Sequence, residues 1–349
     1  MGHGEALVEL RRGLNMAGFE SLATWCALHV AVGLSGTWLA RRYALRRRLL
    51  DQPGERRSHT VATPRGGGIA IVASALLALG WLASTHAVNG TVVAMLAAGL
   101  VLVAGIGWLD DHRPLSPWLR LAVQAVAAAL VALALMTDGH GVAAAGLGFA
   151  TTLVLVNVWN FMDGIDGLAA SQALLVALGW AWLAWPDPWA WLLLALAAGC
   201  LGFLPFNLAP ARIFLGDVGS GSLGYLLAVG LLWLPAGATR WPWLAWLPLS
   251  AFLVDAALTL ALRILRGERW WTPHLQHAYQ YWVAQGGRHA PVTGAYALWT
   301  ACAVVTMVSI RNGGQWMGAA TLVVAYALAA AAWLWSRRNR RSQEGGRQS

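Results

Sequence analysis

The chain has 349 residues, of which 58% are hydrophobic and only 11% are charged. A typical soluble domain carries about 25% charged and about 45–50% apolar residues, so this composition leaves little room for a soluble domain and excludes intrinsic disorder. The 24 basic residues are all arginine and exceed the 15 acidic ones, which gives a net charge of +9. The composition therefore predicts an all-α polytopic membrane protein, whose apolar helix faces are solvated by lipid.

Apolar runs of about 17–25 residues, the length that crosses a bilayer as a helix, recur along the chain. We expect eleven transmembrane helices within one integral-membrane domain over residues 1–349, and the first run is too long for a cleaved signal peptide. They lie near residues 19–40, 67–85, 91–109, 118–137, 141–159, 168–185, 189–206, 220–236, 242–264, 291–310 and 317–335. A basic tail over 336–349 is expected to follow the last helix.

The arginines indicate which helix ends face the cytoplasm. When alternate connections are grouped, one group holds 20 arginines, counting Arg120 just inside its helix and Arg263 just before its loop. The other, which includes the N-terminus, holds Arg11, Arg12, Arg240 and Arg311. Positively charged connections are retained on the cytoplasmic side of a membrane, so the arginine-rich group is predicted to be cytoplasmic. The acidic and histidine side chains that could take part in catalysis or binding fall on the same side, which predicts that the protein acts at its cytoplasmic face.

Two acidic motifs lie at predicted inner helix ends. Asp110 and Asp111 end the third apolar run, where adjacent carboxylates repel each other unless a cation or a proton offsets them. Asn160, Asp163 and Asp166 follow the fifth run, and their regular spacing would place them along one face of a continuing helix. A calcium loop is an alternative for the second motif, but it lacks the twelve-residue spacing and the terminal Glu of such loops.

A third motif spans residues 210–220 and follows Asn207. Asp217 stands there beside a glycine turn at a predicted helix start, a position that attracts phosphate groups. The glycines of 219–224 match a dinucleotide-binding pattern, but no βαβ unit surrounds them, so packing of small residues in a membrane helix is the better interpretation.

Two further inner connections are rich in arginine and histidine. His274 and His277 lie in the connection over 263–280, which lacks a third ligand at zinc spacing. It therefore favours a clamp for an anionic group or a patch that binds lipid headgroups. The connection over 51–68 contains a Pro-Arg-Gly-Gly-Gly turn around Arg65 that leads straight into a span. A basic membrane anchor alone does not explain that turn.

Together these motifs bring carboxylates and cationic side chains to one membrane face. Carboxylate oxygens with few soft ligands suit Mg²⁺ or Mn²⁺, and arginines beside such a metal suit phosphates. Phosphoryl transfer needs both, and a lipid-borne phosphate acceptor would explain why the protein lies in the membrane. A transporter is the alternative from another class, but transporters place ionisable groups near the bilayer midplane, where Asp255 is the clearest candidate.

At these residues the sequence resembles the polyprenyl-phosphate N-acetylhexosamine-1-phosphate transferases, which include O-antigen-initiating enzymes and the muramoyl-pentapeptide transferase of peptidoglycan synthesis. The matching stretches occur in the family's order over about residues 50–285, at 63–68, 110–111, 160–168, 212–220 and 273–280. The last stretch looks closest to the branch that starts O-antigen or capsule chains, and it lacks the three consecutive histidines typical of the muramoyl enzymes.

The resemblance implies transfer of a sugar-1-phosphate from a UDP-N-acetylhexosamine to undecaprenyl phosphate, which gives an undecaprenyl-diphospho-sugar and UMP and initiates O-antigen or other surface polysaccharide synthesis. The muramoyl-pentapeptide reaction is the alternative within the family, and GlcNAc, GalNAc and 6-deoxy amino sugars all stay open. The resemblance also implies Mg²⁺ (or Mn²⁺), a location in the bacterial inner membrane with the active site on its cytoplasmic face, and no nucleic-acid partner. A homodimer is left open.

The resemblance also implies roles for single residues. Asp217 would bind Mg²⁺ with Asn160 as a second ligand, and Asp110 would be the base or the orienting carboxylate for the lipid phosphate. The expected catalytic residues are Asp110, Asp111, Asp163, Asp166, His274 and His277. The expected substrate-binding residues are Arg65, Arg120, Asn207, Phe214, which would stack on uracil, and Arg288.

Overall fold

The computed structural model describes residues 18–52, 61–269, 271–272, 274–286 and 288–345. Each of the eleven predicted apolar runs is helical, which confirms an all-α polytopic membrane protein. In chain order the helices are α2 (Gly18–Arg47), α3 (Ile69–Ser84), α4 (Gly90–His112), α5 (Pro117–Thr137), α6 (Val142–Phe161), α7 (Leu168–Ala184), α8 (Trp189–Asn207), α9 (Asp217–Leu232), the 3-10 helix η1 (Pro242–Leu249) with α10 (Ser250–Leu265), the short α11 (Ala278–Ala284), α12 (His289–Ile310) and α13 (Gln315–Gly345).

Some of these boundaries differ from the predicted ones. Helix α9 begins at Asp217 instead of near residue 220, because the glycine turn ends immediately before that aspartate. The predicted run over 242–264 is divided into η1 and α10, and Pro248 lies inside η1, where it cannot donate a helical hydrogen bond. Part of the predicted tail, residues 336–345, continues α13 as helix.

Eight of the described helical segments are long and apolar enough to cross a membrane, whereas α3, α7 and α9 are apolar but have only 16 or 17 residues. At about 1.5 Å per residue these three are roughly 25 Å long, which is less than the bilayer core of about 30 Å. All three begin on the side of the molecule where the acidic motifs lie.

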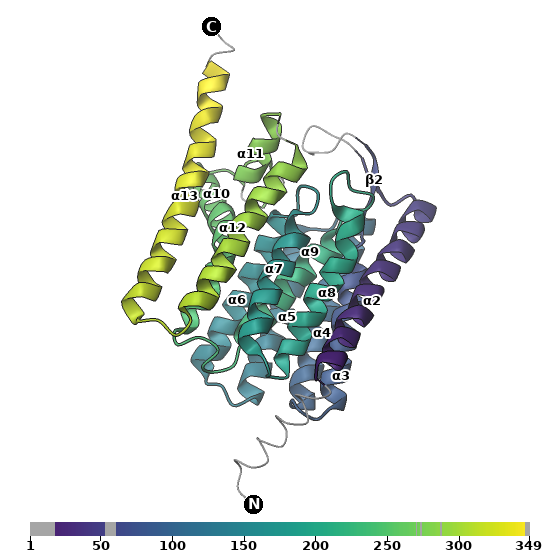
Figure 1. The fold of residues 1–349 in the computed structure, drawn as a ribbon. Helices are drawn as coiled ribbons and strands as arrows, with labels where there is room; N and C mark the ends of the chain where they lie inside the picture. Colours follow the sequence, from purple (N-terminus) through teal and green to yellow (C-terminus); the bar gives the residue numbers. More distant parts are fainter. Residues whose placement is uncertain (1–17, 53–60, 270, 273, 287, 346–349) are drawn as a thin grey trace, which may run out of the picture.

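The chain crosses the bundle an odd number of times. Helix α2 starts at the lower end of the molecule and the last turns of α13 project from the upper end (Figure 1). The short α11 and the ribbon formed by β1 (Leu50–Asp51) and β2 (Thr63–Pro64) lie at this upper end too. In the ribbon Leu50 pairs with Pro64 and Asp51 with Thr63, in antiparallel register. The upper end carries the predicted cytoplasmic connections.

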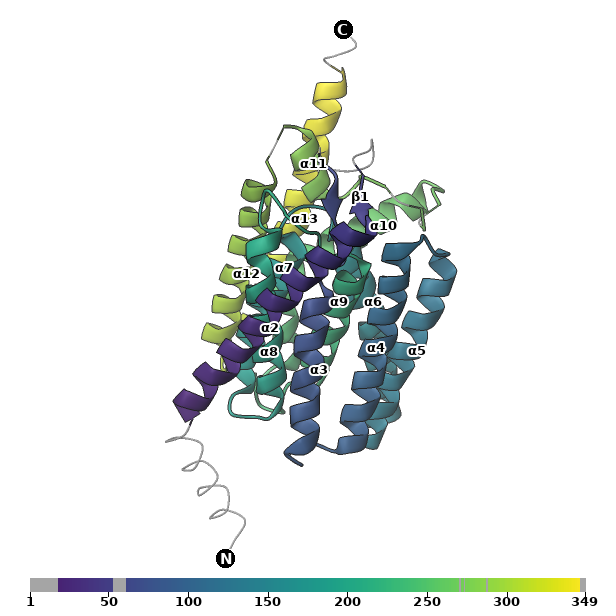
Figure 2. The same ribbon diagram turned by 90° about the vertical axis from the view of Figure 1, so that its right-hand side faces the viewer.

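Helix α2 crosses the bundle obliquely (Figure 2) and packs against α3 and α8. The crossing is close because glycines face each other. A Cβ on Gly33 would lie only 2.6 Å from the carbonyl oxygen of Gly199 and 3.1 Å from the Cα of Gly202. Close approach of small residues is a common way to join helices in lipid, where the hydrophobic effect gives no drive between them.

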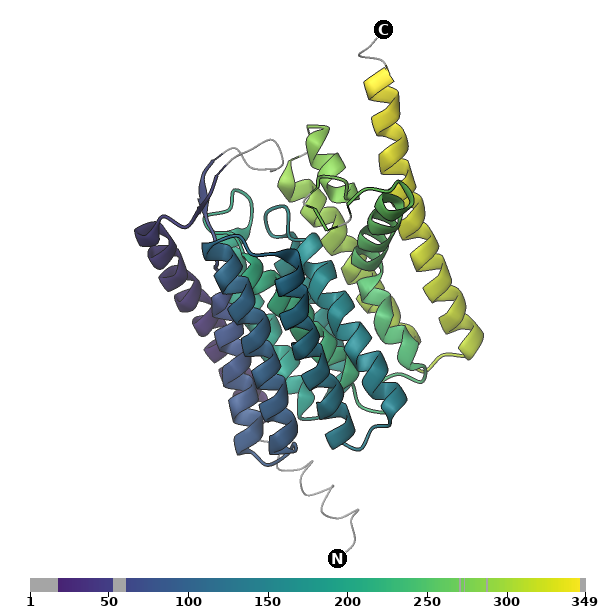
Figure 3. The ribbon, with the colours of Figure 1, turned by 180° about the vertical axis from the view of Figure 1, so that it is seen from behind.

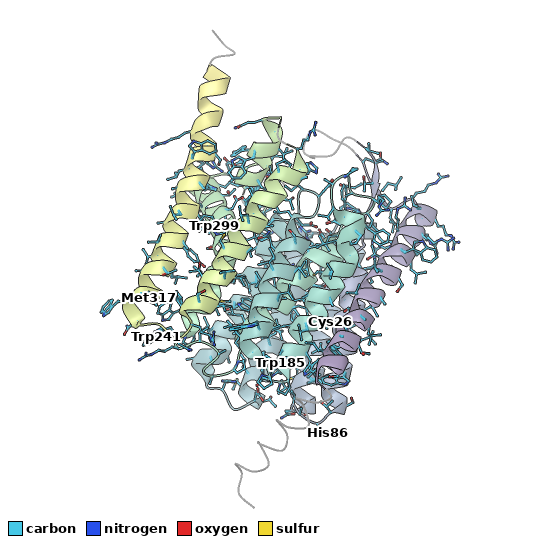
Figure 4. All side chains as sticks on the ribbon, in the orientation of Figure 1. Cys26, His86, Trp185, Trp241, Trp299 and Met317 are labelled. Carbon is cyan, nitrogen blue, oxygen red and sulfur yellow. The ribbon has the colours of Figure 1, made fainter. Side chains whose placement is uncertain are left out.

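Helices α10, α12 and α13 stand to one side of the other helices (Figure 3). Helix α13 packs mainly on α10 and α11, while α12 packs on α7 and η1. The described outer connections carry aromatic side chains, and Trp185 and Trp241 lie toward the lower end with His86 and Met317 (Figure 4). Tryptophan at this level is expected where a helix leaves the membrane.

Candidate active site

Asp111 joins the inner end of α4 to the start of α9. Its Oδ1 accepts the backbone N–H of Asp217 and its Oδ2 that of Val218, both at 3.1 Å, and the residue is 3% exposed. Gly107, one turn earlier in α4, lies against the backbone of Asp217 so closely that a Cβ would collide with its carbonyl. Asp111 therefore fixes where α9 begins, which a sequence could not reveal.

Asp110 and Asp217 share one guanidinium. Nη1 of Arg120 donates to Asp110 Oδ2 and to Asp217 Oδ2, each at 2.9 Å. The other oxygen of Asp110 accepts the backbone N–H of Leu115 at 2.6 Å. Both oxygens of Asp110 are thus engaged, and its geometry is that of a carboxylate that orients Arg120.

Asn160 contacts Asp217 from the end of α6. Its Nδ2 donates to Asp217 Oδ1 at 3.1 Å and to the hydroxyl of Ser220 at 3.0 Å. This arrangement leaves the amide oxygen of Asn160 as the atom that can face a ligand. The two residues predicted as metal ligands are therefore direct neighbours, although they are 57 positions apart.

A cavity of about 260 Å³ opens beside this group, at the inner end of the bundle. Seven of the predicted site residues line it: Arg65, Asp111, Asp163, Asp166, Asn207, Phe214 and Asp217. Gly67 N donates to the carbonyl of Phe214, and Phe214 N donates to that of Pro64, both under 3 Å, so the 64–67 turn is joined to the segment before α9. This joint positions Arg65, whose Nε lies 3.9 Å from Asp111 Oδ1.

Asp163 lies where this first cavity meets a second one, of about 300 Å³, and lines both. Its carboxylate has no hydrogen-bond donor within the part of the chain that the structure describes. Burial and the neighbouring carboxylates raise the pKa of Asp163 well above its usual value. Excess negative charge that the protein leaves uncompensated at such a junction favours a bound cation.

Asp166 has a supporting position, although it also lines the first cavity. Its Oδ2 accepts the backbone N–H of Ala211 at 3.0 Å, and its Oδ1 lies 3.2 Å from Nδ1 of His289. The hydroxyl of Thr293 in α12 donates to its carbonyl. Asp166 thereby ties the 162–167 turn to the 208–216 connection and to α12.

Asn207 supports the same turn from the end of α8. Its Oδ1 accepts the N–H of Gly167 and its Nδ2 donates to the carbonyl of Ile213, both at 3.0 Å. Gly167 has a φ of +74°, which a residue with a side chain rarely adopts, so glycine is required at this turn. The buried amide of Asn207 shapes the cavity wall with both of its polar atoms engaged.

The second cavity lies between the inner ends of α5 and α6 and the connection before α11. His274, His277 and Arg120 line it together with Asn160 and Asp163. Burial and the neighbouring cationic side chains lower the pKa of His274 to about 3, so this ring is neutral at pH 7. At the rim the rings of Trp118 and Trp271, 54% and 39% exposed, lie 5.8 Å apart.

At three positions the residues that line the cavities differ from those predicted from the sequence. Arg288 is exposed at the residue before α12 and lines neither cavity, whereas its neighbour His289 lines the first one. Gln280, within the matching stretch 273–280, lines both cavities, although the sequence predicted no role for it. In the sequence, only the proximity of His289 and Gln280 to residues with predicted roles could have indicated that they line a cavity. Two parts of the predicted site connections, residues 53–60 and Pro273, lie outside the described residues.

The donor set fits Mg²⁺, the cofactor that the resemblance implies. Mg²⁺ is usually held by one or two carboxylates together with water and substrate phosphates. No cage of three or more His, Cys, Asp or Glu side chains is found among the described residues, and a site of that kind does not require one. Asp163 and Asp217 both line the first cavity, and the raised pKa of Asp163 indicates that a cation there would relieve repulsion.

Comparison with known proteins agrees with this chemistry. The profile described as glycosyl transferase family 4 matches residues 92–234. The decaprenyl-phosphate N-acetylglucosaminephosphotransferase of Mycobacterium tuberculosis is 35% identical over 54% of each chain, so the match spans about half of that relative. The probable undecaprenyl-phosphate N-acetylglucosaminyl 1-phosphate transferase of Bacillus subtilis is 30% identical over 72% of this chain and 75% of its own. The phospho-N-acetylmuramoyl-pentapeptide-transferase of Thermosynechococcus vestitus is 30% identical over 59% and 61%, respectively.

Proposed function

Since this chain belongs to glycosyl transferase family 4, we propose that it transfers the sugar-1-phosphate of a UDP-N-acetylhexosamine to undecaprenyl phosphate. An oxygen of the lipid phosphate attacks the phosphorus that carries the sugar, and the bond from that phosphorus to the oxygen of UMP breaks. The products are undecaprenyl-diphospho-sugar and UMP. This reaction would be the first step of a surface polysaccharide such as O-antigen.

One observation carries the proposal. Five carboxylates and two arginines from five separate chain segments gather where two cavities meet. They are Asp110, Asp111, Asp163, Asp166, Asp217, Arg65 and Arg120. Phosphoryl transfer between two large substrates needs a place for each of them and charge at the point of contact, because its catalysis is mostly positioning and electrostatic stabilisation.

The first cavity suits the nucleotide sugar. Phe214 offers an aromatic face for uracil, and Arg65 offers a guanidinium for phosphate oxygens. Asp166 and Asn207 act by holding the wall in place, as their hydrogen bonds to Ala211 and Gly167 support.

The second cavity suits the lipid phosphate. Its rim carries the exposed Trp118 and Trp271, a residue type enriched at membrane interfaces, and Arg120 lies inside it with His274 and His277. A polyprenyl phosphate is already largely ionised at neutral pH, so the acceptor does not depend on a strong general base. We therefore assign Asp110 the orienting role, because Arg120 and Leu115 occupy both of its oxygens.

Asp217 and Asn160 would hold Mg²⁺, with Asp163 facing the same space. When bound, the ion neutralises phosphate charge and acts as a Lewis acid at phosphoryl oxygens. Arg120 already bridges Asp110 and Asp217, so the chain itself links the side of the acceptor to the side of the metal.

Two further points belong to the proposal. The muramoyl-pentapeptide reaction stays a second candidate, because a relative of that name is 30% identical. The active site would face the cytoplasm from a bacterial inner membrane, since 20 of the 24 arginines lie in the connections and helix ends on that side.

The reaction is tested with purified protein, Mg²⁺, undecaprenyl phosphate and a panel of UDP-sugars that includes UDP-GlcNAc, UDP-GalNAc and UDP-muramoyl-pentapeptide. We expect release of UMP and a lipid product whose mass identifies the sugar. Loss of product after EDTA and its return with Mg²⁺ would support the cofactor. Uptake of a sugar into vesicles without any release of UMP would contradict the proposal in favour of a transporter.

The orientation is tested with topology reporters. A reporter inserted within residues 53–60 and one fused after residue 345 should both report the cytoplasm, and one at 237–240 should report the periplasm. A periplasmic signal from the C-terminal fusion would contradict the orientation, because α13 would then end on the outer side.

A further inference from the structure

Asp255 is a buried carboxylate in α10, 2% exposed, and lies outside both cavities of the candidate active site. An ionisable side chain inside a membrane protein is costly and usually has a functional reason. Asp255 is also the acid that the transporter hypothesis would have used. Its surroundings suggest a different role.

Donors from the histidine-containing connection and from the neighbouring helices surround this carboxylate. Oδ1 of Asp255 accepts the backbone N–H of Ala278 at 2.9 Å and lies 3.3 Å from Nδ1 of His277. Oδ2 accepts the hydroxyl of Tyr296 from α12 at 2.8 Å. Thr259 Oγ1, one helical turn after Asp255, lies 3.3 Å from Oδ1 and accepts Nε1–H of Trp333 from α13.

The contact to His277 decides the state of that ring. An ionised carboxylate only accepts hydrogen bonds, so Nδ1 of His277 must carry the proton that it donates to Asp255. This leaves Nε2 as the ring nitrogen that is available toward the cavity that His277 lines. Stacking on Phe161 and Tyr279 limits rotation of the imidazole further.

Helix α13 holds the same connection from the opposite side. Nη2 of Arg337 donates to the carbonyl of Gln276 at 2.7 Å, directly before His277. The guanidinium also lies over the rings of Trp333 and Tyr281, at 4.3 and 5.2 Å from their centroids. The last long helix therefore reaches the active-site connection, although the family profile ends at residue 234.

We propose that Asp255 and Arg337 are positioning residues that hold His277 over the second cavity, with Asp255 fixing the protonated ring nitrogen and Arg337 fixing the backbone before it. The inference rests on the proposed function and deepens it. It identifies the buried residues that hold His277 where its ring can contact the phosphate of the lipid or the sugar. Outer partners that orient metal-bound imidazoles are commonly worth about 10–100-fold in activity, and we expect the same order for this imidazole.

The test is a double-mutant cycle between Asp255→Asn and His277→Asn, measured as transfer from UDP-GlcNAc to undecaprenyl phosphate. Asp255→Asn should lower kcat by about 10–100-fold and change KM for UDP-GlcNAc little. In the His277→Asn protein the same substitution should cost less than about threefold, because its effect passes through His277. Multiplied losses in the double variant, or full activity of His277→Asn, would overturn the inference.

Arg337→Gln should lower kcat by about tenfold, and Arg338→Gln, which removes the same charge from the exposed neighbouring side chain, serves as its matched control. Equal losses in both variants would overturn the role of Arg337.

Hydrogen exchange gives a readout that does not depend on turnover. The amides of residues 277–281 should exchange at least about tenfold faster in Asp255→Asn, while those of α9 stay unchanged.

The two proposals fail in different ways. A wild-type protein that releases no UMP with any sugar would contradict the proposed function, whereas exchange at 277–281 would still decide whether Asp255 holds the connection. The positioning role alone would be contradicted if the wild-type protein is active, if Asp255→Asn leaves hydrogen exchange at 277–281 unchanged, and if the losses of the two single variants multiply in the double variant.

Discussion

The acidic side chains at the two ends of this bundle are held in different ways. At the outer end Asp138 accepts Nε1–H of Trp233 at 2.8 Å, and Asp187 accepts the N–H of Trp189 at 2.9 Å, so each acid has its own neutral donor. At the inner end Asp110 and Asp217 share Arg120. Their neighbour Asp163 has no donor among the described residues.

This difference in how the carboxylates are compensated distinguishes acids that stabilise the fold from acids that bind a ligand. Isolated acids that cap or join connections stabilise a structure with little repulsion, as at the outer end. Carboxylates that crowd together around too few cations destabilise it unless something else supplies positive charge. The inner end therefore has the electrostatic form of a site that is completed by a bound cation and by substrates.

The largest expected effect is that of Asp217→Asn. Transfer should fall by at least about a thousandfold, because an amide cannot neutralise a divalent cation and would also weaken the contact to Arg120. The measurement is UMP release by variant protein with unchanged membrane insertion. Asp138→Asn, the same change at the outer end, is the control and should stay within twofold of wild type. An Asp217→Asn enzyme with more than about a tenth of the wild-type rate would contradict the metal assignment.

Asp110→Asn should have the next largest effect. Loss of the charge that holds Arg120 should lower kcat by about a hundredfold, since a small misplacement of a phosphate-binding group can cost that much. Binding of the UDP-sugar should be nearly normal in a titration with UDP-GlcNAc. Intact kcat with lost affinity for the nucleotide would reverse the assignment of the two cavities.

Asp166→Ala should act mainly through binding. Removal of the contacts to Ala211 and His289 loosens the wall of the first cavity, so KM for UDP-GlcNAc should rise by about tenfold. The same change should lower the free energy of unfolding by about 1–3 kcal/mol. Steady-state kinetics and thermal unfolding of one preparation measure both. A changed kcat with constant KM would place Asp166 nearer to the chemistry than we infer.

The smallest effect is expected at the outer end, for Asp187→Ala. Loss of the bond to the N–H of Trp189 at the start of α8 should cost about 1 kcal/mol of stability. Transfer at a permissive temperature should be unchanged. A large loss of activity in the folded variant would show that the two ends are coupled, and the comparison would no longer hold.

Much of the architecture could be predicted from the sequence. Hydropathy located all eleven helical runs, because a bilayer core requires long apolar segments whatever their packing. The family was identified from short polar motifs at predicted inner helix ends, and the comparisons confirm that resemblance. Helix ends were less accurate, as at Asp217, since a glycine turn and a partner helix set the first residue of α9.

The partners of each polar atom could not be predicted in the same way. The sequence indicated Arg288, but the structure directs His289 to the cavity, because the turn before α12 decides which side chain faces inward. It marked Asp255 as an acid within a span, without any sign that α10, α11 and α12 surround it with donors.

Composition and motif order by themselves determined that this chain is a multi-pass membrane protein with its acidic motifs and most of its arginines at one end. Both properties depend on counts and on position along the chain. Tertiary structure alone decided that Asp111 fixes the start of α9 and that Arg120 joins Asp110 to Asp217. Those contacts join residues about a hundred positions apart, or depend on where two helix ends meet, so hydropathy and local spacing carry no information about them.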